Sequence, residues 1–431
     1  MYDAVVVGIG GVGSFALRAL SKCSGGRFLG LESFHRCHAK GSSHGKSRIY
    51  RRAYFENPYY VPWIEQSLSI FKELECEQSV SLLQECGTLL VAPSNTSDTR
   101  NQQNQLHPLL EASQRSAVEH GIPTEFFPSD ELAQRYPQLN YHNDQDLPMV
   151  GLLEPHGGLV RPERAMESAL RTAEQSGCVE IMENALVTTM KQVDNTDSGY
   201  IALRVRRTLT HNSGGIEEEA LEVLTKCVLI SAGSWTGHLI PSWAPKLTVT
   251  RQLQSWIDVK ETSDHPDIFH SNRFPGWFME SPNWHLPLYG IPCDPDAGDY
   301  AHWIKVSSHC RNDPVHDLSS NPSQVSRQEY AELQAKATRA LAPEAWSKTG
   351  GSAPDFVESI PCLYTMSPDG HFIIGTPEIY KKKMNVFAVA GLSGHGFKMT
   401  PALGQMMADF ATGKSLEAWN LDFCSPSRFG V

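Results

Sequence analysis

Three short runs of consecutive apolar residues are spread along the chain, and each runs into a turn that contains glycine. They span residues 4–7, 227–231 and 386–390. Unbroken apolar runs are typical of strands that are buried on both faces of a parallel sheet. A helical pattern over residues 12–22 follows the first run, and a second strand at 28–31 ends at Glu32. The pattern predicts a βαβ unit whose sheet is completed by strands from much later in the chain.

Two other segments carry clear structural patterns. Residues 200–208 and 217–224 alternate between apolar and polar on either side of His-Asn-Ser-Gly-Gly at 211–215, which predicts a hairpin with a glycine-rich turn. The segment Gly-Leu-Ser-Gly-His-Gly-Phe-Lys at 391–398 leads into a further helix. For that helix we predict Thr400 as N-cap, Pro401 as the first residue and an end at Gly413.

The spacing of these units indicates a discontinuous domain. A chain of 431 residues is too long for one ordinary core, so we expect two domains. The predicted fold class is α/β, or α+β overall, with a Rossmann-like dinucleotide-binding domain. We assign 1–86, 151–240 and 351–431 to that domain, and 87–150 and 241–350 to a substrate domain built on a mixed or antiparallel sheet.

Composition narrows the functional classes. The net charge is −11, which disfavours a nucleic-acid partner because such proteins carry a basic surface. No run approaches the ~20 apolar residues of a membrane-spanning helix. The ten cysteines form no C-x-x-C pair or metal-ligand spacing, so we expect a reducing compartment and no metal. With Met1 almost directly before a core strand and a C-terminus unlike Ser-Lys-Leu, we expect a cytoplasmic protein.

The first glycine turn carries a dinucleotide-binding pattern. Gly8, Gly10 and Gly13 fit G-x-G-x-x-G between a strand and a helix, which allows the tight turn, close approach to a pyrophosphate and helix–strand packing. Glu32, at the end of the second strand, is placed to accept hydrogen bonds from a ribose diol. The pattern does not separate FAD from NAD, although the acidic residue argues against NADP.

The segment G-S-S-H-G-K-S-R-I-Y-R-R-A-Y at 41–54 identifies a relationship. It resembles a segment of the monomeric sarcosine oxidase family, which includes N-methyltryptophan oxidase and pipecolate oxidase. Further matching segments follow in family order, among them S-A-G-S-W at 231–235, C-L-Y at 362–364 and G-H-G-F-K at 394–398. The resemblance implies a two-domain monomeric FAD enzyme that oxidises the C–N bond of a secondary amino acid to an imine and reduces O2 to H2O2.

The resemblance also implies roles for single residues. Cys362 is expected to carry the flavin through an 8α-S-cysteinyl bond, Lys305 to serve oxygen reduction, and Arg51 with Lys398 to bind the substrate carboxylate. Without the resemblance these are ordinary residues: a small buried cysteine, a solvated strand lysine and surface charges. The other expected catalytic residues are Arg48, His44 and His309. The other expected substrate contacts are Tyr289 and Tyr364. The remaining cofactor contacts are expected from Ser42, Val187, Gly394 and Gly396, and His44, Arg48 and Lys398 are expected to contact the cofactor as well.

Two departures from the family pattern leave the substrate open. Phe55-Glu56 replaces a small residue before the glutamate, and residues 291–303 form a Pro- and Asp-rich connection in place of a short glycine-rich one. Sarcosine, another N-methyl amino acid, a cyclic imino acid such as pipecolate and a larger N-alkyl amino acid all remain candidates. The alternatives to an oxidase are an NAD-dependent dehydrogenase, a flavin-dependent amine dehydrogenase that does not use O2, and a flavin-binding protein without turnover.

Overall fold

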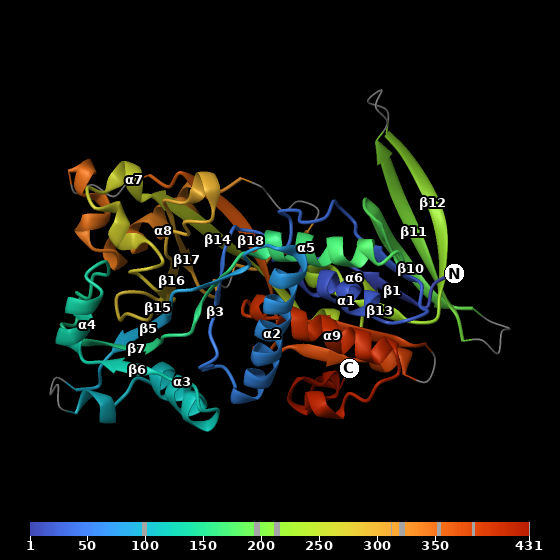
Figure 1. Cartoon of the computed structure of the whole chain (residues 1–431), viewed down its shortest axis with the longest axis horizontal. Coiled ribbons are helices and arrows are strands. Elements are labelled where there is room, and N and C mark those ends of the chain that lie inside the picture. Colours follow the sequence, from blue (N-terminus) through green and yellow to red (C-terminus); the bar gives the residue numbers. More distant parts are fainter. Residues whose placement is uncertain are drawn as a thin grey trace.

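The computed structural model describes residues 1–96, 101–193, 199–210, 216–311, 313–318, 324–350, 355–381 and 384–430. Two lobes are visible in Figure 1, each built around its own large sheet. One holds the N-terminal βαβ unit together with the C-terminal helices, and the other holds the middle of the chain. Within the described part of the chain, every helix is too short or too polar to cross a bilayer.

A six-stranded sheet forms the first lobe, in the order β19-β20-β13-β1-β2-β9. Its strands are parallel except for the β19–β20 pair. The strands are β1 (Ala4–Val7), β2 (Phe28–Leu31), β9 (Val179–Met182), β13 (Val228–Ile230), β19 (Ile373–Gly375) and β20 (Val386–Ala390). All three apolar runs of the sequence are therefore neighbours in one sheet, with β13 between β1 and β20.

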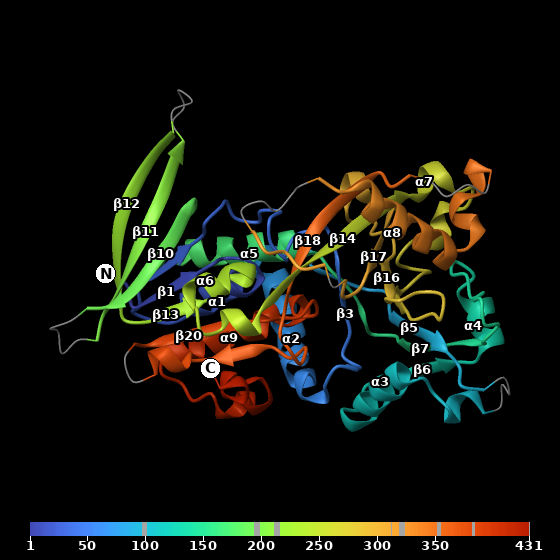
Figure 2. The same ribbon diagram turned by 180° about the vertical axis from the view of Figure 1, so that it is seen from behind.

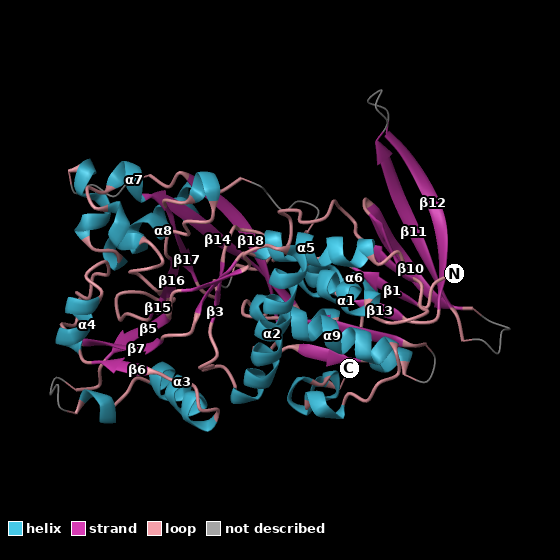
Figure 3. Ribbon diagram, viewed as in Figure 1, coloured by secondary structure: helices cyan, strands magenta, loops and turns pink. Residues whose placement is uncertain are grey.

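Both faces of this sheet are covered, which explains the unbroken apolar runs. Three helices pack on one face (Figure 3), namely α1 (Gly11–Ser21), α5 (Pro162–Gln175) and α9 (Thr400–Ala411), and α2 (Val61–Gln78) packs against α5 and α9. On the other face stand a three-stranded sheet and the short helix α6 (Thr236–Leu239). The three strands are β10 (Ala185–Gln192), β11 (Ile201–Thr210) and β12 (Ile216–Thr225). Val187 of β10 and Leu203 of β11 belong to the same buried cluster as Val5 of β1.

An eight-stranded mixed sheet forms the second lobe, in the order β18-β14-β17-β16-β15-β5-β7-β6 (Figure 2). Every pair is antiparallel except β15–β5. The strands are β5 (Thr88–Pro93), β6 (Glu125–Phe127), β7 (Met149–Glu154), β14 (Thr248–Asp258), β15 (Gly276–Met279), β16 (Leu288–Ile291), β17 (Trp303–Ser308) and β18 (Glu358–Met366). The helices of this lobe are α3 (Pro108–Glu119), α4 (Ser129–Arg135), α7 (Val259–Thr262) and α8 (Arg327–Ala340).

A small sheet of β3 (Arg48–Tyr50), β8 (Gly158–Val160) and β4 (Leu83–Glu85) completes the strands. The predicted fold class is confirmed, since a parallel sheet covered by helices is combined with a mixed sheet. The predicted hairpin is also present as β11 and β12, while its turn at 211–215 lies outside the described residues. The domain boundaries stay a prediction.

One helix start differs from the prediction. Helix α9 begins at Thr400 and its N-cap is Met399, so Thr400 does not cap it. The Thr400 hydroxyl instead donates to the carbonyl oxygen of Phe397 at 2.8 Å. The reason is local: residues Phe397–Met399 already form a helical turn that leads straight into α9, so Thr400 has a helical backbone conformation.

Candidate active site

One large cavity, with a volume of about 1460 Å³, connects the two lobes. It begins at the carboxyl ends of β1, β2, β13 and β20, the edge at which open parallel sheets bind ligands, and reaches residues that follow β3 and β17. Its size exceeds the roughly 300–1,000 Å³ of ordinary small-molecule pockets. The volume therefore suits an extended cofactor together with a substrate.

The glycine turn after β1 forms the first end of the cavity. Gly8 has a φ of +86°, which side chains other than glycine rarely adopt. A Cβ on Gly13 would lie 2.0 Å from the carbonyl oxygen of Gly8, so helix α1 can approach the turn only with glycine there. Glu32 accepts hydrogen bonds from the backbone N–H groups of Ile9 (3.0 Å) and Phe34 (3.1 Å), and its carboxylate faces the cavity.

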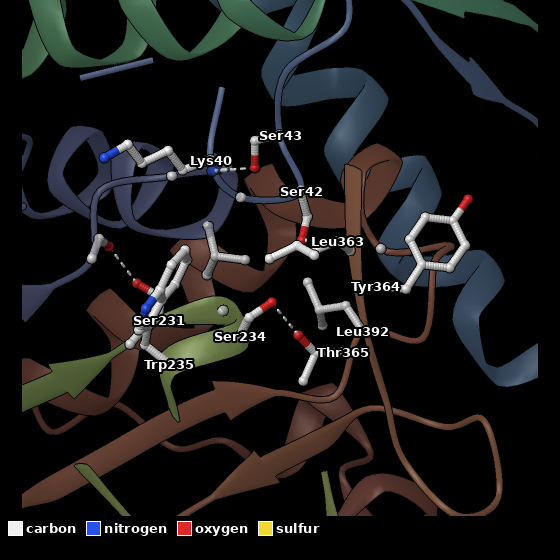
Figure 4. A pocket seen from close by; sticks show the side chains of 18 of the residues that line it. Lys40, Ser42, Ser43, Ser231, Ser234, Trp235, Leu363, Tyr364, Thr365 and Leu392 are labelled. Atoms are coloured by element: carbon white, nitrogen blue, oxygen red, sulfur yellow. Dashed lines mark hydrogen bonds between the residues drawn. The ribbon is translucent and has the colours of Figure 1, made fainter. Parts of the chain in front are cut away.

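Serine side chains tie the neighbouring segments to this turn (Figure 4). The N–H of Gly11 donates to the hydroxyl of Ser43 at 3.1 Å, and the hydroxyl of Ser231 donates to the carbonyl oxygen of Gly8 at 2.7 Å. The hydroxyl of Ser42 donates to the carbonyl oxygen of Leu363 on β18 at 2.5 Å. These contacts hold the 41–43 segment between the turn after β1 and the second lobe.

Two cations lie at the other end of the cavity. One nitrogen of Arg51 donates to both carboxylate oxygens of Glu56 at 2.7 Å. Burial alone would raise the pKa of Glu56, but Arg51, His395 and Lys398 together hold it at about 2. Burial, assisted by the charge of Arg51, lowers the pKa of Lys398 to about 7. This end of the cavity therefore carries one ion pair, Arg51 with Glu56, and one amine, Lys398, whose pKa lies near neutrality.

A tyrosine–histidine pair supports Lys398. The hydroxyl of Tyr54 lies 2.6 Å from Nδ1 of His395, and Nε2 of His395 lies 3.0 Å from the carbonyl oxygen of Gly370. Nζ of Lys398 donates to the carbonyl oxygen of His395 at 2.7 Å and to the hydroxyl of Tyr54 at 3.4 Å. Since burial lowers the pKa of His395 to about 4, its imidazole is neutral at physiological pH.

Aromatic side chains line the space beside the two cations. The guanidinium of Arg51 lies 3.8 Å from the ring centre of Phe55, and the Phe55 and Phe278 ring centres are 5.6 Å apart. His309 lies 5.9 Å from Tyr364 and 6.3 Å from Tyr289, again between ring centres. Burial lowers the pKa of His309 to about 4, so it too is neutral. The pocket thus offers an apolar, aromatic surface next to positive charge.

Arg48 faces the cavity, and the buried side chains of Lys305 and Cys362 lie behind it. The guanidinium of Arg48 donates to the carbonyl oxygens of Ser42 and Ser47, both at 2.9 Å, and lies 3.8 Å from Sγ of Cys362. Nζ of Lys305 donates to the carbonyl oxygen of Ser47 at 2.9 Å, and its side chain is 1% exposed. Burial raises the pKa of Cys362, and neighbouring cations partly offset this.

Most of the residues expected from the sequence line this one cavity. The exceptions are Gly13, which packs against the turn, and the three buried residues His44, Lys305 and Cys362. The cavity-lining ones are Gly8, Gly10, Glu32, Ser42, Arg48, Arg51, Val187, Tyr289, His309, Tyr364, Gly394, Gly396 and Lys398.

Several further residues at the site were not assigned a role from the sequence. They are Ser43, Tyr54, Glu56, Phe278 and His395. Tyr54 and His395 belong to the two most specific motifs, and Glu56 lies in a segment marked as a departure, so each had a sequence signal. Phe278 had none, because only the pairing of β15 with β5 and β16 brings it to the cavity.

These features together define a dinucleotide-dependent oxidoreductase. The parallel sheet has a glycine turn after its first strand and an acidic residue after its second, and the cavity leads from there to a cationic, aromatic end. Residues 3–410 match the FAD dependent oxidoreductase family. The chain belongs to this family, and it is a flavin-dependent oxidoreductase. This assignment excludes the NAD-dependent dehydrogenase.

Two known proteins are similar to this chain over nearly its whole length. Monomeric sarcosine oxidase of Streptomyces avermitilis is 28% identical over 414 residues, covering 95% of this chain and 93% of the relative. N-methyl-L-tryptophan oxidase of Yersinia pestis is 28% identical over 417 residues, covering 96% and 95%. The structure of NikD, an unusual amino acid oxidase essential for nikkomycin biosynthesis, aligns with a TM-score of 0.73 at 19% identity, covering 99% of this chain and 97% of NikD. The predicted relationship to the sarcosine oxidase family is confirmed.

The cavity fits FAD. The glycine turn and Glu32 suit the pyrophosphate and a ribose at one end. At the other end the backbone of Gly394 is pressed against Tyr364, so closely that a Cβ would lie 2.2 Å from its ring. The residues of this glycine-rich turn and Thr400 at the start of α9 line the cavity, and a helix start placed there favours negative charge on a flavin ring.

Proposed function

We propose that this protein is an FAD-dependent oxidase of a secondary amino acid, either an N-methyl or a cyclic imino acid. The amine loses two electrons and two protons as its C–N bond becomes an imine, O2 takes them up as H2O2, and water hydrolyses the imine. The main observation in support of the proposal is that two cations, Arg51 and Lys398, lie at the aromatic end of a cavity that fits FAD.

Arg51 and Lys398 are proposed to bind the substrate carboxylate. A guanidinium binds a carboxylate through two parallel hydrogen bonds, and an ammonium adds a point charge. In the present structure Glu56 takes the guanidinium contacts and the carbonyl oxygen of His395 takes those of Lys398. A bound substrate would therefore exchange with Glu56 for Arg51, while Tyr54 and His395 keep Lys398 in place.

The neighbouring aromatic wall is proposed to bind the rest of the substrate. Phe55, Phe278, Tyr289 and Tyr364 offer apolar surface to an N-methyl group or a saturated ring, with the neutral His309 among them. A neutral imidazole leaves the amine free of a competing positive charge, and hydride loss requires an uncharged amine.

Lys305 is proposed to serve the oxygen-reducing half of the reaction. The first electron transferred to O2 produces an anion, which a fixed cation in a dry site stabilises. Lys305 is buried behind Arg48, with two backbone carbonyl oxygens as hydrogen-bond acceptors. Burial and the charge of Arg48 lower its pKa well below the ordinary value, so its charge depends strongly on the groups around it.

Cys362 is proposed to carry the flavin through a thioether to the 8α-methyl carbon. The S–C bond would form with loss of one hydrogen from the thiol and one from the methyl group, and O2 would take up both with their two electrons as H2O2. The Arg48 guanidinium, 3.8 Å from Sγ, can stabilise the thiolate that such a bond requires. Monomeric state and a cytoplasmic location remain predictions from the sequence.

A peroxide assay over a panel of amino acids tests this function. The panel contains sarcosine, longer N-methyl amino acids, proline, pipecolate, and the matching primary amino acids. We expect peroxide with one or more secondary amino acids and little with the primary ones. Substrate-dependent reduction of an artificial dye without peroxide would instead establish the amine dehydrogenase, and the absence of flavin reduction by every compound would contradict the proposal.

A further inference from the structure

An aromatic cage encloses the ammonium group of Lys46. Its Nζ lies 4.4 Å from the ring centre of Trp256, 4.5 Å from that of Tyr300 and 5.5 Å from that of Trp303. Glu358 forms an ion pair with the same nitrogen. A cation held over several rings is fixed in direction as well as attracted, and Trp256 is only 2% exposed. We call Trp256, Tyr300 and Trp303 the Lys46 cage.

Two of the three rings of this cage come from the connection at 291–303. Tyr300 and Trp303 stand at the end of the 291–303 connection, which departs from the short link of the sarcosine oxidase pattern. Trp256 belongs to β14, where it pairs across the sheet with Lys305 of β17 on one side and with Glu358 of β18 on the other (Figure 2). The connection, the sheet and Lys46 thus meet at one point.

Lys46 is also central to the loop that holds Lys305. The residues on either side, Gly45 and Ser47, supply the two carbonyl oxygens that accept hydrogen bonds from Nζ of Lys305, at 3.1 and 2.9 Å. Lys46 itself has a φ of +64°, which a lysine adopts only when its surroundings impose it. Lys305 also lies 5.4 Å from the ring centre of Trp256, so the two lysines share one indole.

We propose that Lys46 is a positioning residue for Lys305, an inference that rests on the proposed role of Lys305 in oxygen reduction. The cage and Glu358 fix the Lys46 side chain. Together with Glu163, whose carboxylate accepts hydrogen bonds from the backbone N–H groups of Gly45 and Lys46, the fixed side chain holds the backbone at positive φ. This turns the carbonyl oxygens of Gly45 and Ser47 toward Lys305. Without the cage the loop relaxes and the ammonium of Lys305 loses its fixed direction.

Stopped-flow kinetics of Lys46→Met test the inference. Methionine keeps the length of the side chain and removes the charge that the cage binds. We expect flavin reduction by substrate without oxygen to proceed normally, and reoxidation by O2 to slow by about tenfold, the effect of losing partly exposed cation–π contacts with three rings together. Lys46→Arg should restore reoxidation, because a guanidinium also stacks on aromatic rings.

A double-variant comparison shows whether Lys46 acts through Lys305. If it does, Lys46→Met combined with Lys305→Met is no slower in reoxidation than Lys305→Met alone. The matched control is Arg27→Met, which removes a cation that contacts an aromatic ring, Tyr2, and a carboxylate, Glu180, at the far edge of the nucleotide-binding sheet. This control should leave both half-reactions unchanged.

Hydrogen exchange gives a readout that does not depend on turnover. The amides around 45–47 should exchange faster in Lys46→Met, and in Tyr300→Leu, which opens the cage from its exposed side. Normal reoxidation in Lys46→Met, beside slow reoxidation in Lys305→Met, would overturn the inference and leave the proposed function intact. Normal reoxidation in Lys305→Met would overturn the proposed oxygen role itself.

Discussion

Binding of a carboxylate ligand should weaken as the pH rises through about 7, because Lys398 loses its charge there. Its pKa is about 7 in the ligand-free protein. The other titrating groups beside it do not change in this range, since the pKa of Glu56 is about 2 and those of His395 and His309 are about 4. The ammonium form falls about tenfold for each pH unit above 7. Loss of one charged hydrogen bond, about 1.5–3 kcal/mol, then limits the total weakening to about 10- to 150-fold, because Arg51 still binds.

Benzoate is a suitable probe for this prediction, because it has a carboxylate and no amine that titrates. Its dissociation constant is measured from the change in flavin absorbance between pH 6 and 9. The dissociation constant should be nearly constant up to pH 7 and then rise, whereas Lys398→Met should bind weakly with no such rise. A flat profile for the unchanged protein, or the same rise in the variant, would show that Lys398 does not meet the carboxylate.

Three other predictions concern the same cavity. Arg51→Ala should weaken substrate binding by at least about tenfold, and the decarboxylated amine should be a poor substrate of the unchanged enzyme; equal oxidation of the amine and the amino acid would contradict this. After acid precipitation the yellow colour should stay with the protein and be released by Cys362→Ala, so free flavin from the unchanged protein would disprove the linkage. Gly13→Ala places a Cβ 2.0 Å from the carbonyl oxygen of Gly8, so flavin content should fall and the free energy of unfolding should drop by about 1–3 kcal/mol; unaltered flavin content and melting temperature would contradict the packing argument.

The central strands of the first lobe could be predicted from the sequence because the rules that specify them are local, whereas the edge strands β9 and β19 were not predicted. Parallel strands covered on both faces need unbroken apolar runs, and glycine turns mark their carboxyl ends, so β1, β13 and β20 were identified at distant positions. The start of α9 was misplaced by one residue, since the helical turn that precedes it depends on how 391–398 packs. The strand order of the eight-stranded sheet has no such local rule. Its β15–β5 pair joins residues nearly two hundred positions apart.

Site residues that belong to a sequence motif could be proposed from the sequence, whereas those brought to the cavity only by packing could not. Arg51 and Lys398 reach one cavity, as their motifs indicated. The hydrogen-bond partners of these two residues could not be predicted from the sequence. The contact of Glu56 with Arg51, and those of Tyr54 and His395 with Lys398, depend on side-chain directions in the folded protein. The charge state of Lys398 follows from burial, which no single residue of the sequence reveals.

The strand order of the nucleotide-binding sheet constrains how the protein is made. Strand β1 is synthesised long before its neighbour β13, which pairs with it through residues such as Leu229, and longer still before β20, which begins at Val386. Contacts between such distant segments form slowly. The nascent chain therefore displays an unfinished sheet until β20 has been synthesised, and the turn at 391–398 completes the cofactor site after that strand. Flavin incorporation should thus follow translation, and a riboflavin shortage would leave complete but unloaded chains for the cell's chaperones and proteases.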